Sequence, residues 1–124
     1  MKEFSRADRV GAQMQRELAL LLRDEAKNPR LAEVTIQEVR VTRDLSHAKV
    51  YFTVLDSEEA PLFTEMLGHA AGFLRKRLGQ IMKLRTVPEL HFVYDRSIEE
   101  GQRLSALIEK AVASDRREDE DGQA

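Results

Sequence analysis

Residues 34–54 read VTIQEVRVTRDLSHAKVYFTV, and they decide the fold because two apolar alternations flank a short polar turn. In the second alternation, apolar residues recur at every second position: Ala48, Val50, Phe52 and Val54. This period is typical of a strand that buries one face. The first alternation changes phase near Glu38, which indicates a β-bulge. The stretch therefore predicts two antiparallel strands joined by a turn at residues 43–46.

The segment before this hairpin has the period of a helix. Its apolar residues recur at intervals that share one helical face: Val10, Met14, Leu18, Leu21 and Leu22. Ser5 is a favourable N-cap, and Asp8 stands where a carboxylate stabilises the positive end of a helix. We therefore expect a helix over residues 6–25 that ends before Asn28-Pro29.

Residues 57–82 predict further helix with an interruption at a glycine. Ser57 is a candidate cap, and apolar residues have helical spacing both before and after Gly72. A glycine inside a helix costs roughly 1 kcal/mol relative to alanine. We therefore expect two helical segments joined by a kink at Ala70-Ala71-Gly72.

A third strand and a last helix complete the expected elements. Leu90, Phe92 and Tyr94 recur at every second position, and Ser97 with Glu100 forms the S-x-x-E pattern of a capping box. The last helix has an apolar stripe that we expect to be buried: Leu104, Leu107, Ile108 and Ala111. Residues 115–124 carry five acidic and two basic residues without apolar periodicity, which predicts a disordered acidic tail.

These elements predict an α+β domain over residues 1–114, followed by the tail over residues 115–124. A three-stranded sheet with helices packed on one face is the simplest arrangement that buries the apolar stripes. Up to residue 95, the order helix, strand, strand, helix, helix, strand matches the type II KH arrangement of RNA-binding domains. The last helix is an addition to that arrangement.

Length and composition exclude several classes of protein. A chain of 124 residues that is 42% hydrophobic is expected to form one globular domain. Because it has no cysteine, disulfide scaffolds, cysteine-ligated metal sites and thiol nucleophiles are excluded. No apolar run approaches the ~18 residues of a membrane helix, and residues 1–10 lack signal-peptide character. We therefore expect a cytoplasmic protein.

Positive charge is concentrated in one stretch, although the formal net charge is -2. Residues 72–85 contain five basic residues and no acidic one: Arg75, Lys76, Arg77, Lys83 and Arg85. Basic clusters neutralise phosphates and release counterions, so this stretch predicts contact with nucleic acid. A solvated helix face and a membrane surface are the alternatives. Gly72 either admits a phosphate to the bare backbone or marks a close packing point.

The sequence contains no recognisable catalytic motif. Phosphate-binding glycine motifs and the serine-hydrolase motif are absent. The histidines His47, His69 and His91 do not have the helical spacing of a metal site, although a site that combines histidine with carboxylates stays geometrically possible. We therefore expect no enzyme activity, no cofactor and no bound metal.

Three stretches of this chain resemble the ribosome-binding factor A family. They are AAGFLR at residues 70–75, TRDLSHAKV at residues 42–50, and LRTVPELHF at residues 84–92 followed by DRSI at residues 95–98. Arg9-Val10 in the first helix is a further, shorter piece. The resemblance extends from about residue 4 to residue 112. It implies a KH-like domain in which an Ala-x-Gly kink, here Ala70-Ala71-Gly72, replaces the usual G-x-x-G loop. Gly72 would then lie at the RNA-facing junction of two helices.

The resemblance also implies a function. Members of this family are non-catalytic assembly factors that bind the free or immature 30S small ribosomal subunit and its 16S rRNA. They promote late maturation, including 5′-end processing of precursor 16S rRNA, and they are important in cold adaptation. They act alongside assembly GTPases, among them Era and a ribosome-dependent GTPase that releases them. We expect the same of this chain, as a monomer.

The basic residues and the resemblance together predict an RNA-binding surface. Its main candidates are Gly72, Arg75, Lys76, Arg77, Lys83 and Arg85. Its weaker candidates are Arg43, His47 and Lys49 near the hairpin, and Arg6 and Arg9 in the first helix. The alternative function is a protein–protein interaction module that another assembly factor brings to the ribosome. Such a module would bind bare RNA weakly and with little dependence on salt.

Overall fold

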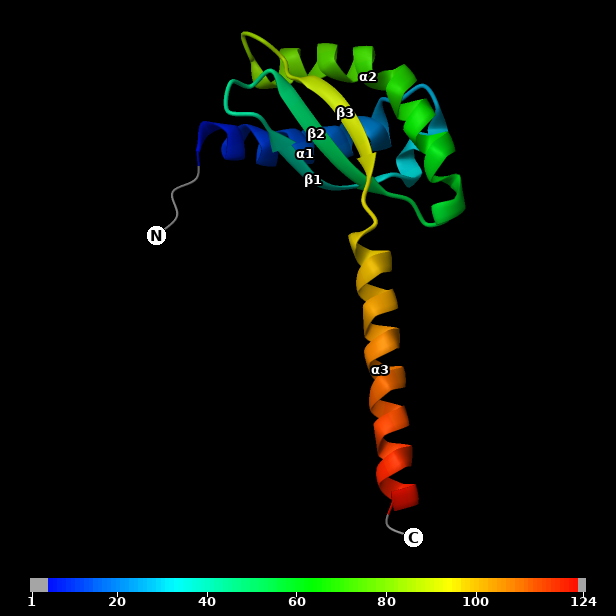
Figure 1. Ribbon diagram of the computed structural model, residues 1–124. Helices are drawn as coiled ribbons and strands as arrows, with labels where there is room; N and C mark the ends of the chain where they lie inside the picture. Colours follow the sequence, from blue (N-terminus) through cyan, green and yellow to red (C-terminus); the bar gives the residue numbers. More distant parts are fainter. Residues whose placement is uncertain (1–4, 123–124) are drawn as a thin grey trace.

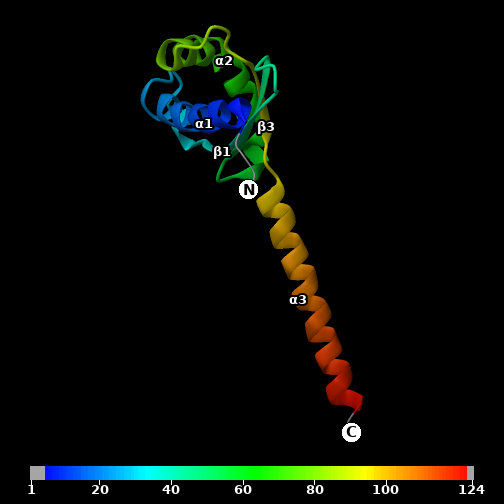
Figure 2. The same cartoon turned by 90° about the vertical axis from the view of Figure 1, so that its left-hand side faces the viewer.

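The computed structural model describes residues 5–122, with the side chains of all of these except residue 98 and residues 115–122. The elements follow in this order: α1 (Arg6–Asp24), the 3₁₀ helix η1 (Pro29–Glu33), β1 (Thr35–Val41), β2 (His47–Thr53), the 3₁₀ helix η2 (Ser57–Glu59), α2 (Ala60–Met82), β3 (Glu89–Tyr94) and α3 (Ser97–Gly122). Figures 1 and 2 show α1 and α2 on one face of the sheet, whereas α3 points away from the body. The predicted α+β class is confirmed.

The sheet is three-stranded and mixed, in the order β1-β2-β3. β1 and β2 are antiparallel, and β2 and β3 are parallel. The register of the hairpin shifts between Ile36 and Glu38, so the predicted bulge is confirmed. Because of this shift, Ile36 and Val39 are both buried, although three positions separate them.

The hydrophobic core lies between the sheet and the two helices. It is built around the central strand, where Ala48, Val50 and Phe52 are all 0% exposed. The predicted stripe of α1 contributes Met14 and Leu18 to the same core. The core also includes residues that the strand and helix patterns did not predict, such as Leu31 of η1. Among the described residues, no polar or charged side chain is buried.

The N-terminus of α1 has the predicted cap. The Asp8 amide donates to the Ser5 hydroxyl at 3.1 Å, and the Ser5 amide donates to the Asp8 carboxylate at 3.0 Å. This reciprocal pair satisfies two amides that a helix end otherwise leaves without partners. The helix ends at Asp24, one residue before the predicted end.

The predicted caps at Ser57 and Ser97 are wrong. In each case an aspartate that precedes the serine, Asp56 or Asp95, accepts the backbone amide instead. The Asp56 carboxylate accepts the amide of Glu58 at 3.1 Å, and α2 itself begins without a side-chain cap. The Asp95 carboxylate accepts the amide of Ser97 at 2.9 Å. An aspartate readily accepts the amide two residues later, and this local geometry displaces the serine.

The two helical segments expected around Gly72 form one helix instead. α2 is continuous over Ala60–Met82, and Figure 1 shows that its path bends near the middle. Leu67, Leu74 and Leu78 are fully buried on both sides of the glycine, and this shared burial outweighs the modest cost of a glycine in a helix. A Cβ at Gly72 would meet nothing within 4 Å, so the close-packing interpretation is also wrong.

The expected burial of the last helix is wrong as well. Leu104, Leu107 and Ile108 are 60%, 59% and 55% exposed, because α3 projects away from the body of the protein, as Figure 1 shows. The backbone of residues 115–122 continues the helix, where the sequence predicts a disordered tail. No proline or glycine interrupts that stretch before Gly122. Residues 123–124 lie outside the described residues.

Within the described part, no helix combines the length and the apolar character needed to cross a membrane.

A carboxylate organises the turn between β1 and β2. Asp44 Oδ1 accepts the hydroxyls of Thr42 and Ser46, both at 2.7 Å, and the Ser46 amide at 3.1 Å. Hydrogen bonds from Ser46 and Thr42 lower the pKa of Asp44 to about 2. Leu45 adopts a left-handed conformation with φ 61°, which closes the turn. The Asp44 hydrogen bonds therefore hold a turn that lies at the surface in one defined shape.

The first prediction concerns the close approach of α1 to β1. A Cβ at Gly11 would lie 2.6 Å from the backbone oxygen of Val39. We expect Gly11→Ala to lower the free energy of unfolding by about 1–2 kcal/mol, because overpacking outweighs the higher helix propensity of alanine. Gly68→Ala in α2 is the control, since its Cβ meets nothing within 4 Å and should raise stability slightly. If urea denaturation gave G11A and G68A the same free energy of unfolding, this close packing would be contradicted.

The second prediction concerns acid stability. The pKa of Asp44 is lower in the folded protein than its ordinary value of 3.8, so its contribution is present above about pH 4 and is lost as the pH falls toward 2. We expect Asp44→Asn to be less stable than the natural chain near neutral pH. The difference should shrink between about pH 4.5 and pH 3. Urea titrations across that range measure it, and a constant difference would show that the carboxylate charge does not stabilise the turn.

Candidate nucleic-acid interface

Arg75, the first basic residue of the 72–85 stretch, holds the connection between α2 and β3. Its Nε donates to the Pro88 carbonyl at 3.2 Å, and its Nη2 donates to the Val87 carbonyl at 2.9 Å. Pro88 is fully buried. Arg75 is therefore engaged in hydrogen bonds within the protein, although its side chain stays exposed, whereas the sequence suggested that it contacts phosphates.

Arg77 joins α2 to the C-terminal end of α1. Its Nε and Nη2 donate to the two carboxylate oxygens of Glu25 at 3.0 and 3.3 Å, and its Nη1 donates to Gln80 Oε1 at 2.7 Å. All three guanidinium nitrogens are therefore used. Three of its five N–H donors are already used, and Glu25 neutralises its charge.

The other three basic residues of the stretch are not engaged in this way. Lys76 lies on α2, Lys83 caps the C-terminus of that helix in a left-handed conformation with φ 53°, and Arg85 lies in the following loop. Within the described part of the chain, none of the three has an ion-pair or hydrogen-bond partner. They can therefore contact a phosphate without breaking an existing interaction.

The tertiary structure brings further basic residues to the end of the molecule where the α2–β3 loop lies. A Cβ added at Gly11 would lie 3.5 Å from Val41 Cγ2, which places the start of α1 beside the end of β1. The Glu89 amide donates to the Ser46 carbonyl at 2.9 Å, which joins the β1–β2 turn to the start of β3. Figures 1 and 2 show these three segments at the same end.

We call this region the basic end, and we define it by five residues that reach solvent: Arg6, Arg9, Arg43, Lys83 and Arg85. They come from the start of α1, the β1–β2 turn and the α2–β3 loop. In the described part of the chain, none of the five is engaged in an ion pair or a side-chain hydrogen bond. The sequence named all five as candidates but did not show that they gather at one end.

Gly72 lies on an exposed part of α2 beside an apolar hollow. The hollow has a volume of about 410 Å³. Its lining comes from the α1–β1 connection and from the middle of α2: Ala26, Lys27, Asn28, Leu31, Met66, His69, Ala70 and Phe73. Phe73 is 38% exposed. The surface next to the glycine is therefore open, and two cationic or titratable side chains, Lys27 and His69, border it.

His47 and Lys49 lie on the outer face of the sheet, away from the helices. His47 Nδ1 is 3.0 Å from Nε2 of His91, and Lys49 is the register partner of His91. Tyr51 on the same strand is half-buried, with the Arg40 guanidinium 5.3 Å from the centre of its ring. Because the arginine covers this ring, the outer face does not present Tyr51 for base stacking.

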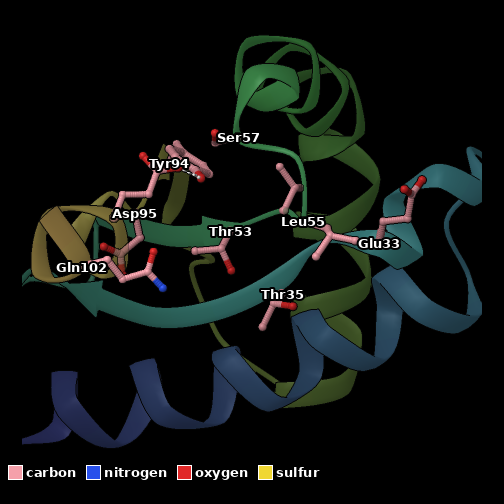
Figure 3. Close-up of a pocket in the computed structure, with 10 residues that line it drawn as sticks. Glu33, Thr35, Thr53, Leu55, Ser57, Tyr94, Asp95 and Gln102 are labelled. Atoms are coloured by element: carbon pink, nitrogen blue, oxygen red, sulfur yellow. Dashed lines mark hydrogen bonds between the residues drawn. The ribbon is translucent and has the colours of Figure 1, made fainter. Parts of the chain in front are cut away.

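A second hollow, shown in Figure 3, lies near the start of α3 and has a volume of about 470 Å³. Tyr94 donates to Glu99 at 3.1 Å there, and burial together with this carboxylate raises the pKa of Tyr94. Hydrogen bonds from Ser97 hold the pKa of Asp95 below its usual range. With Glu33 also in the lining and no basic residue, this hollow does not suit a phosphate.

Comparisons with known proteins agree with the sequence resemblance. A family model described as ribosome-binding factor A matches residues 6–108. Ribosome-binding factor A of Thioalkalivibrio sulfidiphilus is 60% identical over 121 residues, which are 97% of this chain and 94% of the relative.

A crystal structure and a map-fitted model of relatives are similar in fold. The crystal structure of ribosome-binding factor A from Thermus thermophilus is 28% identical, with a TM-score of 0.63 over 73% of this chain and 98% of that chain. A homology model of the Thermus thermophilus factor, fitted into the cryo-EM map of a 30S complex, is 30% identical, with a TM-score of 0.57 over 69% and 91% of the two chains. The resemblance is confirmed: this chain belongs to the ribosome-binding factor A family.

Proposed function

We propose that this protein is a non-catalytic assembly factor that binds the 30S small ribosomal subunit, and that its basic end contacts phosphates of the 16S rRNA. The observation that carries the proposal is the gathering of five solvent-accessible basic residues, unpaired within the described part of the chain, from three separate segments. Family membership and the relative fitted into a map of a 30S complex support the partner. Neutralising rRNA phosphates releases counterions, which drives binding that weakens as salt rises.

Arg75 and Arg77 have a supporting role in this proposal. Arg75 holds the loop that carries Lys83 and Arg85, through the carbonyls of Val87 and Pro88. Arg77 holds α2 against the end of α1 through Glu25. Lys76 extends the contact surface along α2 from the basic end. These assignments revise the sequence-based view that all five basic residues of the 72–85 stretch contact phosphates alike.

We also propose that the fold is a type II KH-like domain in which Ala70-Ala71-Gly72 replaces the G-x-x-G loop. The order α1, β1, β2, α2, β3 and the bend of α2 support this interpretation. Because a continuous helix uses its own amides, Gly72 does not offer the N-terminus of a separate helix to a phosphate. Its contribution is instead steric, since a missing side chain lets the RNA backbone approach α2 closely.

Further parts of the proposal rest on family membership alone. They are promotion of 5′-end processing of precursor 16S rRNA, importance in the cold, and action alongside Era and a ribosome-dependent releasing GTPase. The protein would act as a monomer in the cytoplasm. Holding immature rRNA until release requires no catalytic group.

A protein–protein interaction module is the second candidate function, and one observation favours it. α3 exposes Leu104, Leu107 and Ile108 on a helix that projects from the body. An apolar helix face of this kind is typical of contact with a protein partner. The two functions differ in how binding responds to salt.

The next prediction tests the basic end. We expect the double substitution Lys83→Asn and Arg85→Gln to weaken binding to immature 30S subunits and to reduce the salt dependence by about one unit of slope per lost contact. Asparagine is chosen at residue 83 because it tolerates the left-handed conformation there. Cosedimentation with subunits across a potassium chloride series measures both quantities.

The matched control is Arg103→Gln with Lys110→Gln on α3, which removes the same charge from two exposed positions outside the basic end. It should leave the affinity and the salt slope close to those of the natural chain. Equal losses in both double variants would mean that general charge attraction, and not the basic end, drives binding. Binding that is insensitive to salt in every variant would favour the protein-interaction function.

A separate prediction tests the steric role of Gly72. Both Gly72→Ala and Gly68→Ala add a methyl group into open space on α2, so both should raise stability by up to about 1 kcal/mol. We expect only Gly72→Ala to weaken binding to immature 30S subunits, by several-fold. Thermal melts and cosedimentation of the two variants separate stability from binding. If both variants bind as well as the natural chain, close approach of RNA at Gly72 is refuted.

A further inference from the structure

Three potential metal ligands converge on the outer face of the sheet, where β2 and β3 begin. His47 on β2 is the register partner of Glu89 on β3, and His91 follows two residues later on the same face. His47 Nδ1 lies 3.0 Å from His91 Nε2 and 3.7 Å from Glu89 Oε2. One ligand atom from each of the three side chains lies within 4.8 Å of the other two.

These distances fit one small tetrahedral ion. Zinc binds imidazole nitrogens and carboxylate oxygens at roughly 2.0–2.2 Å, so neighbouring ligand atoms around it are about 3.3 Å apart. The separations of His47 Nδ1 from the other two ligand atoms, 3.0 and 3.7 Å, lie on either side of that value, and the third separation is at most 4.8 Å. Small rotations of these exposed side chains would equalise the three. Two histidines and one carboxylate leave a fourth position open, as in zinc sites that also bind water or an anion.

The backbone holds the three residues in place without the metal. Parallel pairing fixes His47 opposite Glu89, and the Glu89 amide donates to the Ser46 carbonyl at 2.9 Å. The preceding turn is held by the Asp44 hydrogen bonds. A site that exists before the ion arrives needs little reorganisation, and the exposure of all three side chains leaves a path for the ion to enter.

We propose that His47, Glu89 and His91 bind a divalent transition-metal ion of the zinc type. Imidazole is a good ligand for zinc, nickel and copper, whereas magnesium and calcium prefer oxygen ligands. The bound ion joins β2 to β3 and adds positive charge to the outer face of the sheet. The site does not depend on the proposed ribosomal function, because this protein supplies all three ligands and RNA supplies none.

Sequence spacing predicts no metal site here, and the structure explains the difference. His47 and His91 are 44 positions apart, so no local motif connects them. The parallel register of β2 and β3 supplies their proximity. A site of histidine with a carboxylate is the arrangement that the sequence left geometrically possible.

The test is a zinc titration of the protein without an affinity tag, near pH 7.5, against a chromophoric chelator. We expect one zinc ion per chain, and a loss of affinity of at least about tenfold in His91→Ala. Glu89→Gln should weaken binding less than His91→Ala. The amide oxygen of glutamine can still bind the ion, although it lacks the negative charge of the carboxylate. The matched control is His69→Ala. This histidine lies on α2, away from the proposed site, and its Nε2 is likewise 3.7 Å from a glutamate oxygen, Oε1 of Glu65.

A melting experiment supplies a second measurement. Zinc chloride should raise the melting temperature of the natural chain and of His69→Ala, but not that of His91→Ala, and magnesium chloride should raise none of them. His91 is exposed, so its loss should leave the fold intact, which circular dichroism verifies. The proposal is overturned if zinc binding does not saturate at one ion, or if His69→Ala loses as much affinity as His91→Ala.

Discussion

Burial of the inner face of β2 is the interaction on which the rest of this structure depends. Ala48, Val50 and Phe52 are completely covered by α1 and α2, and their burial requires the sheet to have one register. The bulge in β1 keeps Ile36 and Val39 on that same face. These contacts fix the strands and the helices that carry the turn and the α2–β3 loop, and hydrogen bonds of Asp44 and Arg75 then hold those two connections.

Because the inner face is covered, functional groups are left at one end and on the outer face. Lys83 and Arg85 reach solvent next to a loop whose carbonyls at Val87 and Pro88 accept hydrogen bonds from Arg75. The same sheet register that joins the turn to β3 also brings His47 to His91. One packing arrangement therefore organises both the proposed rRNA surface and the proposed metal site, although their chemistry is different.

The sequence predicted most residues of the candidate site, but it did not predict which of them are free to contact a partner and which are paired within the fold. The absence of acids in residues 72–85 identified Arg77 and Lys83 equally well. Arg77 is paired with Glu25, which is 52 positions away, whereas Lys83 is free within the described part. Charge patterns show where cations are concentrated. They do not show which cations the fold has already paired, because the partners come from other elements.

The sequence by itself determined the two alternating strands of the hairpin, the bulge, the face of α1 that is buried, and the family. Each of these follows from local periodicity or from contiguous motifs, so it needs no knowledge of distant contacts. Only the tertiary structure decided that α2 is continuous, that the stripe on α3 stays exposed, and that five basic residues meet at one end. An apolar stripe or a charge predicts that a partner is possible, and only the packing of other elements decides whether the protein itself provides that partner.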